Sequence, residues 1–304
     1  MMHKEKEVVL ITGANGLVAR SLAQNLHEKY EVRFLTRKPV SRNEFHWNVE
    51  KGEMDACALK GVTHIIHLAG AGVGDKRWSK KRKEEILASR VNSTRLLLET
   101  LKREGISIVS FIAASAVGYY GTIPSEGGVD ESSSPGANFL SHVCLEWERA
   151  SLDYSGLGLF QKHIILRLGV VLSRQGGALP KMLTPIKYHL GAILGWGSQF
   201  MPWIHIADLC AVIAAAVEGR LKSGTYNAVA PEHVSNEEFT RLLAAVYGKR
   251  IFLPPIPGWF VKLLYGEASL LLLEGVPVSS QKLRDAGYSF QFPELRAALL
   301  DLKA

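Results

Sequence analysis

The amino-terminal half alternates short β-branched apolar runs with stretches of helical apolar spacing. Residues 8–11 (VVLI) form an apolar run that ends at a glycine turn, and apolar residues then recur at helical spacing over 17–26. This alternation predicts right-handed crossovers and a mostly parallel, doubly wound sheet. Further strands are expected at 31–36, 45–49, 63–68, 106–113 and 162–168, and helices at 79–103 and around 137–148.

From about residue 172 the pattern loosens into glycine-rich loops. A helix is expected at 206–218, a strand at 225–229, and a further helix after the capping box at 235–238. The sequence shows no internal repeat and no low-complexity linker. We therefore expect an α/β fold: a Rossmann-type domain over 1–171, with contributions from about 204–230, and a smaller α+β lobe over 172–304 that holds a substrate pocket.

The composition fits a soluble globular protein. The chain has 304 residues, of which 47% are hydrophobic and 21% charged, and no apolar run approaches the roughly 18 residues of a membrane span. Its three cysteines are too few and too scattered for a disulfide framework, so a reducing compartment fits best. We expect a cytoplasmic monomer or homodimer without a membrane partner.

The net charge of +7 is concentrated in one segment, KRWSKKRK at 76–83. Such a run can meet phosphates or nucleic acid, but it is more often a solvated helix start. Because the remaining charge is spread along the chain, we expect no nucleic-acid partner.

The turn after the first strand, TGANGLVA at 12–19, carries the spacing of a dinucleotide site. Gly13 and Gly16 let the backbone approach a pyrophosphate, which the amides and the positive dipole end of the next helix hold. Ala19 occupies the third position, where a small residue lets helix and strand pack. A turn that follows a strand and opens a helix favours nucleotide binding over an ordinary tight turn.

The end of the second strand bears on the choice of cofactor. An NAD enzyme usually presents an acid there for the ribose hydroxyls, whereas an NADP enzyme offers arginine to the 2′-phosphate. This strand ends in LTRK, and no acid lies between Val32 and Asn43. We interpret Arg37 as the 2′-phosphate partner, assisted by Thr36 or Lys38; the alternative is that these are ordinary surface charges. NADP is favoured over NAD.

With this turn, the HLAG turn at 67–70 and Ser115, the chain resembles the extended short-chain dehydrogenase/reductases. It is most similar to an atypical branch labelled epimerase family proteins, or nucleoside-diphosphate-sugar epimerases. The resemblance runs through nearly the whole chain, and its last segment is similar to that branch's characteristic C-terminal domain. The matching segments are 76–78, 115–121, 147–148, 167–172, 176–183, 203–209 and 266–283.

The resemblance implies an NADP(H)-binding domain and a C-terminal lobe that closes over a small-molecule pocket. Asp208 is expected to cap a helix, and His205 to contact a ligand or fix its loop. The predicted pocket residues are Gln199, Trp203 and His205. The predicted cofactor contacts are Gly13, Asn15, Gly16, Leu17, Val18, Thr36, Arg37, Lys38, Leu68, Ala69, Gly70, Ala114, Leu168, Gly169 and Val170.

The proton relay of the wider superfamily is absent. There, a tyrosine exchanges a proton with the substrate oxygen, a lysine four residues later lowers the tyrosine pKa, and a serine hydrogen-bonds the same oxygen. Alignment of the helix places Phe139 and Val143 at the tyrosine and lysine positions, and neither side chain can serve. Ser115 is retained, but a lone serine is a hydrogen-bond donor and not a base.

Two sets of residues are candidates to replace the missing tyrosine and lysine. Tyr119 and Tyr120 follow Ser115 at the carboxyl end of a strand, where either hydroxyl can meet a ligand, or both rings can simply pack. His142 lies one turn after Phe139 and is either a base near neutral pH or an exposed, non-catalytic residue. The ten histidines show no metal-binding spacing, so no metal site is expected.

Two functions therefore remain. One is an NADP-dependent oxidoreductase or epimerase acting on a small hydroxylated, carbonyl or nucleotide-sugar substrate, with Ser115, Tyr119 and Tyr120 as the catalytic candidates. The other is a non-catalytic NADP(H)-binding protein with a regulatory or structural role.

Overall fold

The computed structural model describes residues 6–122 and 127–303. Its main sheet has eight strands in the order β10-β7-β6-β5-β1-β2-β3-β4, and every neighbouring pair is parallel except β3 with β4. The strands are β1 (Val8–Thr12), β2 (Glu31–Thr36), β3 (Glu44–Asn48), β4 (Glu53–Met54), β5 (Val62–His67), β6 (Ile108–Ala116), β7 (Phe160–Leu168) and β10 (Gly224–Ala228).

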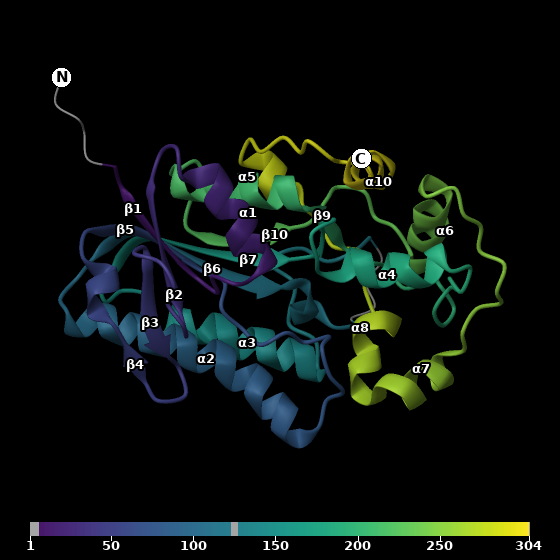
Figure 1. Cartoon of the computed structure of the whole chain (residues 1–304), viewed down its shortest axis with the longest axis horizontal. Helices are drawn as coiled ribbons and strands as arrows, with labels where there is room; N and C mark the ends of the chain where they lie inside the picture. Colours follow the sequence, from purple (N-terminus) through teal and green to yellow (C-terminus); the bar gives the residue numbers. More distant parts are fainter. Residues whose placement is uncertain (1–5, 123–126, 304) are drawn as a thin grey trace.

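Helices cover both faces of this sheet (Figure 1). One face carries α1 (Leu17–Leu26) and α5 (Ile206–Val217), and the other carries α2 (Lys80–Arg103) and α3 (Phe139–Leu152). The α/β, doubly wound fold expected from the sequence is confirmed. Helix α1 has its expected bounds, and the basic run at 76–83 contains the start of α2, with Ser79 as its N-cap.

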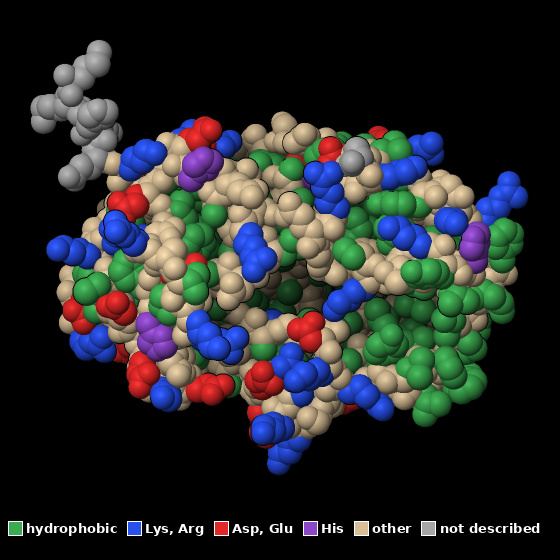
Figure 2. All heavy atoms as spheres, in the orientation of Figure 1, with side chains coloured by type: hydrophobic (Ala, Val, Ile, Leu, Met, Phe, Trp, Pro, Cys, Tyr) green, Lys and Arg blue, Asp and Glu red, His purple; other side chains and the backbone are tan. Residues whose placement is uncertain are grey.

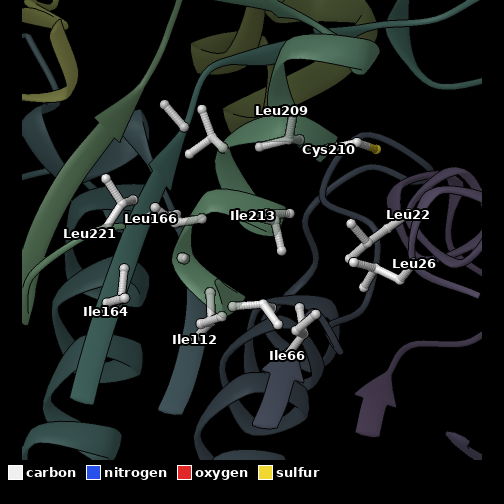
Figure 3. Packing of buried hydrophobic residues seen from close by; sticks show 14 of the residues in the cluster. Leu22, Leu26, Ile66, Ile112, Ile164, Leu166, Leu209, Cys210, Ile213 and Leu221 are labelled. Carbon is white, nitrogen blue, oxygen red and sulfur yellow. The ribbon is translucent and has the colours of Figure 1, made fainter. Parts of the chain in front are cut away.

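The first strand is buried on both sides, which explains its unbroken apolar run. Val9 and Ile11 join the core beneath α1 and α5, whereas Val8 and Leu10 join the core beneath α2 and α3. Figure 3 shows the first of these cores, where Leu22 of α1 and Ile213 of α5 lie close to Ile66 of the sheet.

The carboxyl-terminal part adds smaller elements. Those that build a third core are β8 (Val170–Leu172), α4 (Ala178–Lys187), β9 (Trp203–His205), α6 (Asn236–Val246) and α10 (Leu295–Lys303). The others are α7 (Gly258–Tyr265), η3 (Gly266–Ser269), α8 (Leu270–Leu273) and α9 (Gln281–Asp285). Two 3-10 turns, η1 (Ala56–Leu59) and η2 (Val117–Tyr120), belong to the amino-terminal half. Strands β8 and β9 form a separate parallel pair, and α6 begins with the expected capping box. A domain boundary at 171 stays a prediction.

Asp208 does not cap a helix, contrary to expectation. His205 is the N-cap of α5, because its Nδ1 accepts from the Ala207 amide over 3.1 Å. The buried Asp208 carboxylate instead accepts from the amides of Gln291 and Phe292 over 2.7 and 2.9 Å. It therefore anchors the segment before α10 to α5.

Within the described ranges, no helix is both long enough and apolar enough to cross a membrane.

Candidate functional site

The glycine turn after β1 has the geometry that close backbone approach requires. Gly13 has φ of 76°, and a Cβ at this position would lie 3.2 Å from the Leu68 carbonyl oxygen. Gly16 is the N-cap of α1, and no side chain in the described part of the chain caps the helix. The first-turn amides of α1 therefore remain open toward an anion.

The same turn is tied to the end of β5 by one hydroxyl. Thr12 Oγ1 accepts from the Leu68 and Ala69 amides over 3.0 and 3.1 Å, and it lies 2.9 Å from His67 Nδ1. Because the oxygen accepts from both amides, its own proton goes to the imidazole nitrogen. This hydrogen bond fixes His67 as the neutral form protonated at Nε2.

The far side of the His67 ring agrees with this assignment. Ser93 and Thr94 donate their hydroxyl protons to the Arg90 carbonyl, so their oxygens accept from His67 Nε2 at 3.2 and 3.0 Å. Complete burial lowers the pKa of His67 to about 3, which keeps the ring neutral. A neutral, fully hydrogen-bonded histidine thus holds the glycine turn against the Leu68–Ala69 turn.

Two cations extend from the end of β2 beside the glycine turn. Strands β1 and β2 pair in register, with Thr12 opposite Leu35. Thr36 is buried at the strand end, whereas Arg37 and Lys38 are exposed. Among the described residues, neither cationic side chain forms an ion pair or hydrogen bond, so both are open to a ligand.

The predicted cofactor residues converge at one edge of the sheet. They lie at or just beyond the carboxyl ends of β1, β2, β5, β6 and β7, which are all parallel. At the end of β7, a Cβ on Gly169 would lie 2.8 Å from the Pro202 oxygen, and one on Gly177 would lie 3.2 Å from the Leu17 side chain. The start of α4 therefore lies against the start of α1, and Figure 2 shows a hollow in this part of the surface.

Ser115, at the end of β6, is engaged by a buried ion pair. Its Oγ donates to Glu148 Oε1 over 2.6 Å. The Glu148 carboxylate also receives two hydrogen bonds from the Arg167 guanidinium, each 2.9 Å long, and both residues are buried. Glu148 of α3 and Arg167 of β7 stood in segments of the family resemblance, but their role was missed because they meet only in the fold.

The two tyrosines of η2 pack around the same arginine. Arg167 Nη1 donates to the Tyr120 hydroxyl over 3.0 Å, and this hydroxyl donates to Asn227 Oδ1 over 2.6 Å. Tyr120 is fully buried, and burial raises its pKa to about 12. The Tyr119 ring lies under the guanidinium, with Arg167 Cζ 3.4 Å from its centroid. The structure thus gives both rings a packing role; their catalytic assignment stays a prediction.

The positions of the missing relay are apolar in the structure as well. Phe139 makes an edge contact with Trp78, with ring centroids 5.1 Å apart, and Val143 is buried in the same cluster. His142 is exposed on α3. Cys144, which sequence analysis passed over, lies near Ser115, and burial raises the pKa of its thiol to about 11, so it stays protonated.

The predicted pocket residues have interior contacts. Gln199 Nε2 donates to the carbonyls of Leu194 and Leu272, each over 2.9 Å. Trp203 is fully buried, and His205 caps α5 while its Nε2 lies 3.3 Å from Asp301. Their contact with a substrate stays a prediction. In the part of the chain that the structure describes, no cluster of three His, Cys, Asp or Glu residues suits a metal ion.

A family model described as the NAD dependent epimerase/dehydratase family matches residues 9–228. The chain belongs to this family. A second model, a domain of unknown function (DUF1731), matches residues 256–302.

Relatives of known name cover nearly the whole chain. Epimerase family protein SDR39U1 of Mus musculus is 34% identical over 97% of this chain and 99% of that protein. Epimerase family protein YfhF of Bacillus subtilis is 31% identical over 97% and 98%. The crystal structure of human SDR39U1 (isoform 2) with NADPH superposes with a TM-score of 0.87 at 32% identity, covering 97% of this chain and 98% of that one.

We expect the buried Glu148–Arg167 pair to contribute strongly to the free energy of unfolding. Replacing Glu148 with Gln leaves the Arg167 guanidinium buried without a counter-charge, which should lower the free energy of unfolding by about 3–5 kcal/mol. Glu146→Gln, which removes only an exposed pair with Arg149, should cost less than about 1 kcal/mol. Urea unfolding measures both; equal losses would show that the buried pair is not a special contributor.

We expect the buried His67 ring to make the stability of the protein depend on pH. The folded protein keeps this ring neutral down to about pH 3, whereas the ring in the unfolded chain takes up a proton below about 6.5. Stability from this residue is therefore full above pH 6.5 and lost as the pH falls, by up to about 1.4 kcal/mol per pH unit.

Urea unfolding between pH 7 and 5 measures this slope. His67→Gln should be less stable at pH 7 and lose stability less steeply on acidification than the unsubstituted protein. His46→Gln, at an exposed position, should keep the original slope. Parallel curves for the His67 variant and the unsubstituted protein would contradict the neutral, buried ring.

Proposed function

We propose that the chain binds NADP(H) along the carboxyl edge of the sheet. The observation that carries this proposal is the uncapped start of α1 behind the Gly13 turn, with exposed Arg37 and Lys38 beside it. Open amides and a positive helix end suit a pyrophosphate. Gly13 has no Cβ, and a Cβ at this position would contact the Leu68 carbonyl. The absence of a side chain leaves room for the pyrophosphate of the dinucleotide.

The preference for the 2′-phosphorylated cofactor rests on charge. Arg37 and Lys38 follow β2 where an acid would favour NAD, and a phosphate there would receive charge-assisted hydrogen bonds. Support comes from the human relative, whose crystal structure contains NADPH. The bound cofactor would supply hydride-transfer chemistry, and the chain's own residues would orient it.

Within this proposal the protein acts through nucleotide binding, without the tyrosine–lysine proton transfer of the wider superfamily. Phe139 and Val143 are packed in an apolar cluster, and the Ser115 proton is directed to the Glu148 carboxylate. That carboxylate also accepts two hydrogen bonds from the Arg167 guanidinium, so Ser115 is held within a buried ion-pair network. These contacts support a regulatory or structural role for the bound nucleotide.

A reductase or epimerase is the second candidate. The hollow beside the starts of α1 and α4 in Figure 2 favours it, because a small substrate needs space next to the cofactor. In that case Ser115 or Tyr119 would contact the reacting oxygen.

Replacing Arg37 with Ala tests the cofactor proposal. We expect about tenfold to hundredfold weaker NADPH binding, since a hydrogen bond to a charged group contributes about 1.5–3 kcal/mol, and little change for NADH. Lys60→Ala removes an equal charge from the opposite edge of the sheet and should leave both affinities unchanged. Calorimetric titration of each variant with NADPH and NADH measures these affinities. Unaltered NADPH affinity in the Arg37 variant would refute the 2′-phosphate contact.

A substrate screen separates the two candidates. NADPH absorbance is followed with a panel of carbonyl compounds and nucleotide sugars, using the unsubstituted protein, Ser115→Ala and Tyr119→Phe. The binding proposal expects no turnover with any compound. Turnover that either substitution abolishes would establish the second candidate instead.

A further inference from the structure

Two surface segments, 187–196 and 249–265, expose an unusual number of large apolar side chains. Single exposed hydrophobic residues are normal, but a contiguous field of them marks an interaction surface. The exposed fractions are 93% for Trp196, 72% for Tyr188, 70% for Phe252, 68% for Trp259, 64% for Leu263 and 63% for Leu190.

The two segments form one continuous surface, which we call the apolar face. The Ile256 amide donates to the Ile193 carbonyl over 2.8 Å, and the Gly195 amide donates to the Ile256 carbonyl over 2.9 Å. Lys249 Nζ also lies 3.1 Å from His189 Nε2. Figure 2 shows the result as a broad hydrophobic area over α7 and its neighbours on the right of the molecule.

Helix α7 lies at the centre of the apolar face, and most of its large apolar side chains are exposed to solvent. Val261 is its one buried residue, whereas Trp259, Phe260, Leu263 and Leu264 are exposed. An amphipathic helix normally turns its apolar stripe to the core and its polar residues to water. This helix therefore lacks a partner for its outward surface.

The charged residues within the apolar face have one sign. Segments 187–196 and 249–265 contain Lys187, Lys249, Arg250 and Lys262 and no aspartate or glutamate. Among the acids in the neighbouring helical elements, Glu237 pairs with Arg241 and Glu267 with Lys83. Glu238 accepts hydrogen bonds from Ser235 at the start of α6. A second copy across a two-fold axis would bring the same cations together, which disfavours a homodimer through this face. The partner should be apolar and anionic.

We propose that the apolar face seats the protein on the surface of a membrane that contains anionic lipids. Exposed tryptophan, tyrosine, phenylalanine and leucine side chains suit the headgroup and acyl boundary, and lysine stems extend to reach phosphates. Attachment at the surface needs no spanning helix. It differs from the expectation of no membrane partner, which was drawn from the lack of a long apolar run.

This inference does not depend on the proposed function. The apolar face lies at the α7 end of the molecule, away from β1 and β2 in Figure 1. NADPH affinity, measured on the same variants, should stay unchanged and so separates failure of one proposal from failure of the other.

Co-sedimentation of the full chain with vesicles tests the proposal. We expect binding to vesicles of phosphatidylcholine mixed equally with phosphatidylglycerol, weaker binding at high salt, and little binding to phosphatidylcholine alone. Because Trp196 and Trp259 would enter the interface, tryptophan emission should shift to shorter wavelength on binding.

Variants with matched controls locate the surface. Lys262→Gln should weaken binding to the mixed vesicles about fivefold, the usual effect of one cation near an anionic bilayer. Leu263→Glu should abolish binding, whereas Lys51→Gln and Leu157→Glu, at exposed positions elsewhere, should leave it unchanged. Thermal unfolding checks that each variant is folded.

Two results would overturn the proposal. One is absence of binding to the mixed vesicles, or binding that Leu263→Glu does not reduce. The other is concentration-dependent dimerisation in sedimentation velocity that Leu263→Glu abolishes, with vesicles ignored, which would identify a second copy of the chain as the occupant.

Discussion

The contact between the Arg167 guanidinium and the Glu148 carboxylate holds the centre of the molecule together. It joins β7 to α3, and through Ser115, Tyr120 and Asn227 it reaches β6, η2 and β10. A buried ion pair offsets the cost of desolvating its charges only when further hydrogen bonds satisfy both groups. Ser115 and Tyr120 supply such hydrogen bonds here. Asn227 Nδ2 continues the network to the Ser279 carbonyl, so the carboxyl-terminal part is tied to the main sheet by the same set of contacts.

This network determines what chemistry Ser115 can perform. In a dehydrogenase with the tyrosine and lysine, the serine hydroxyl is available to a substrate oxygen. Here its proton is donated to the Glu148 carboxylate, which also accepts from Arg167. The proposed dinucleotide site is built differently, from backbone at the Gly13 turn and from the Thr12 and His67 hydrogen bonds. Nucleotide binding can therefore persist where the proton relay is gone.

Features encoded by neighbouring residues could be predicted from the sequence. The buried run of β1, the bounds of α1, the capping box of α6 and the glycine turn all depend on residues a few positions apart. The Ser115 network could not, because Glu148 and Asn227 lie 33 and 107 positions from the residues they contact. Likewise His205 displaced Asp208 as the cap because distant amides, in the segment before α10, took the carboxylate. The apolar face could not be predicted either, because it forms only where two segments far apart in the sequence, 187–196 and 249–265, come together in the fold.

A crystal structure of the protein with NADPH tests nucleotide binding most directly. The pyrophosphate should lie on the amides at the start of α1, and the 2′-phosphate should lie within hydrogen-bond distance of the Arg37 guanidinium. Ser115 should remain bonded to Glu148. A nucleotide bound elsewhere, or a 2′-phosphate directed to solvent away from Arg37, would contradict the proposed site.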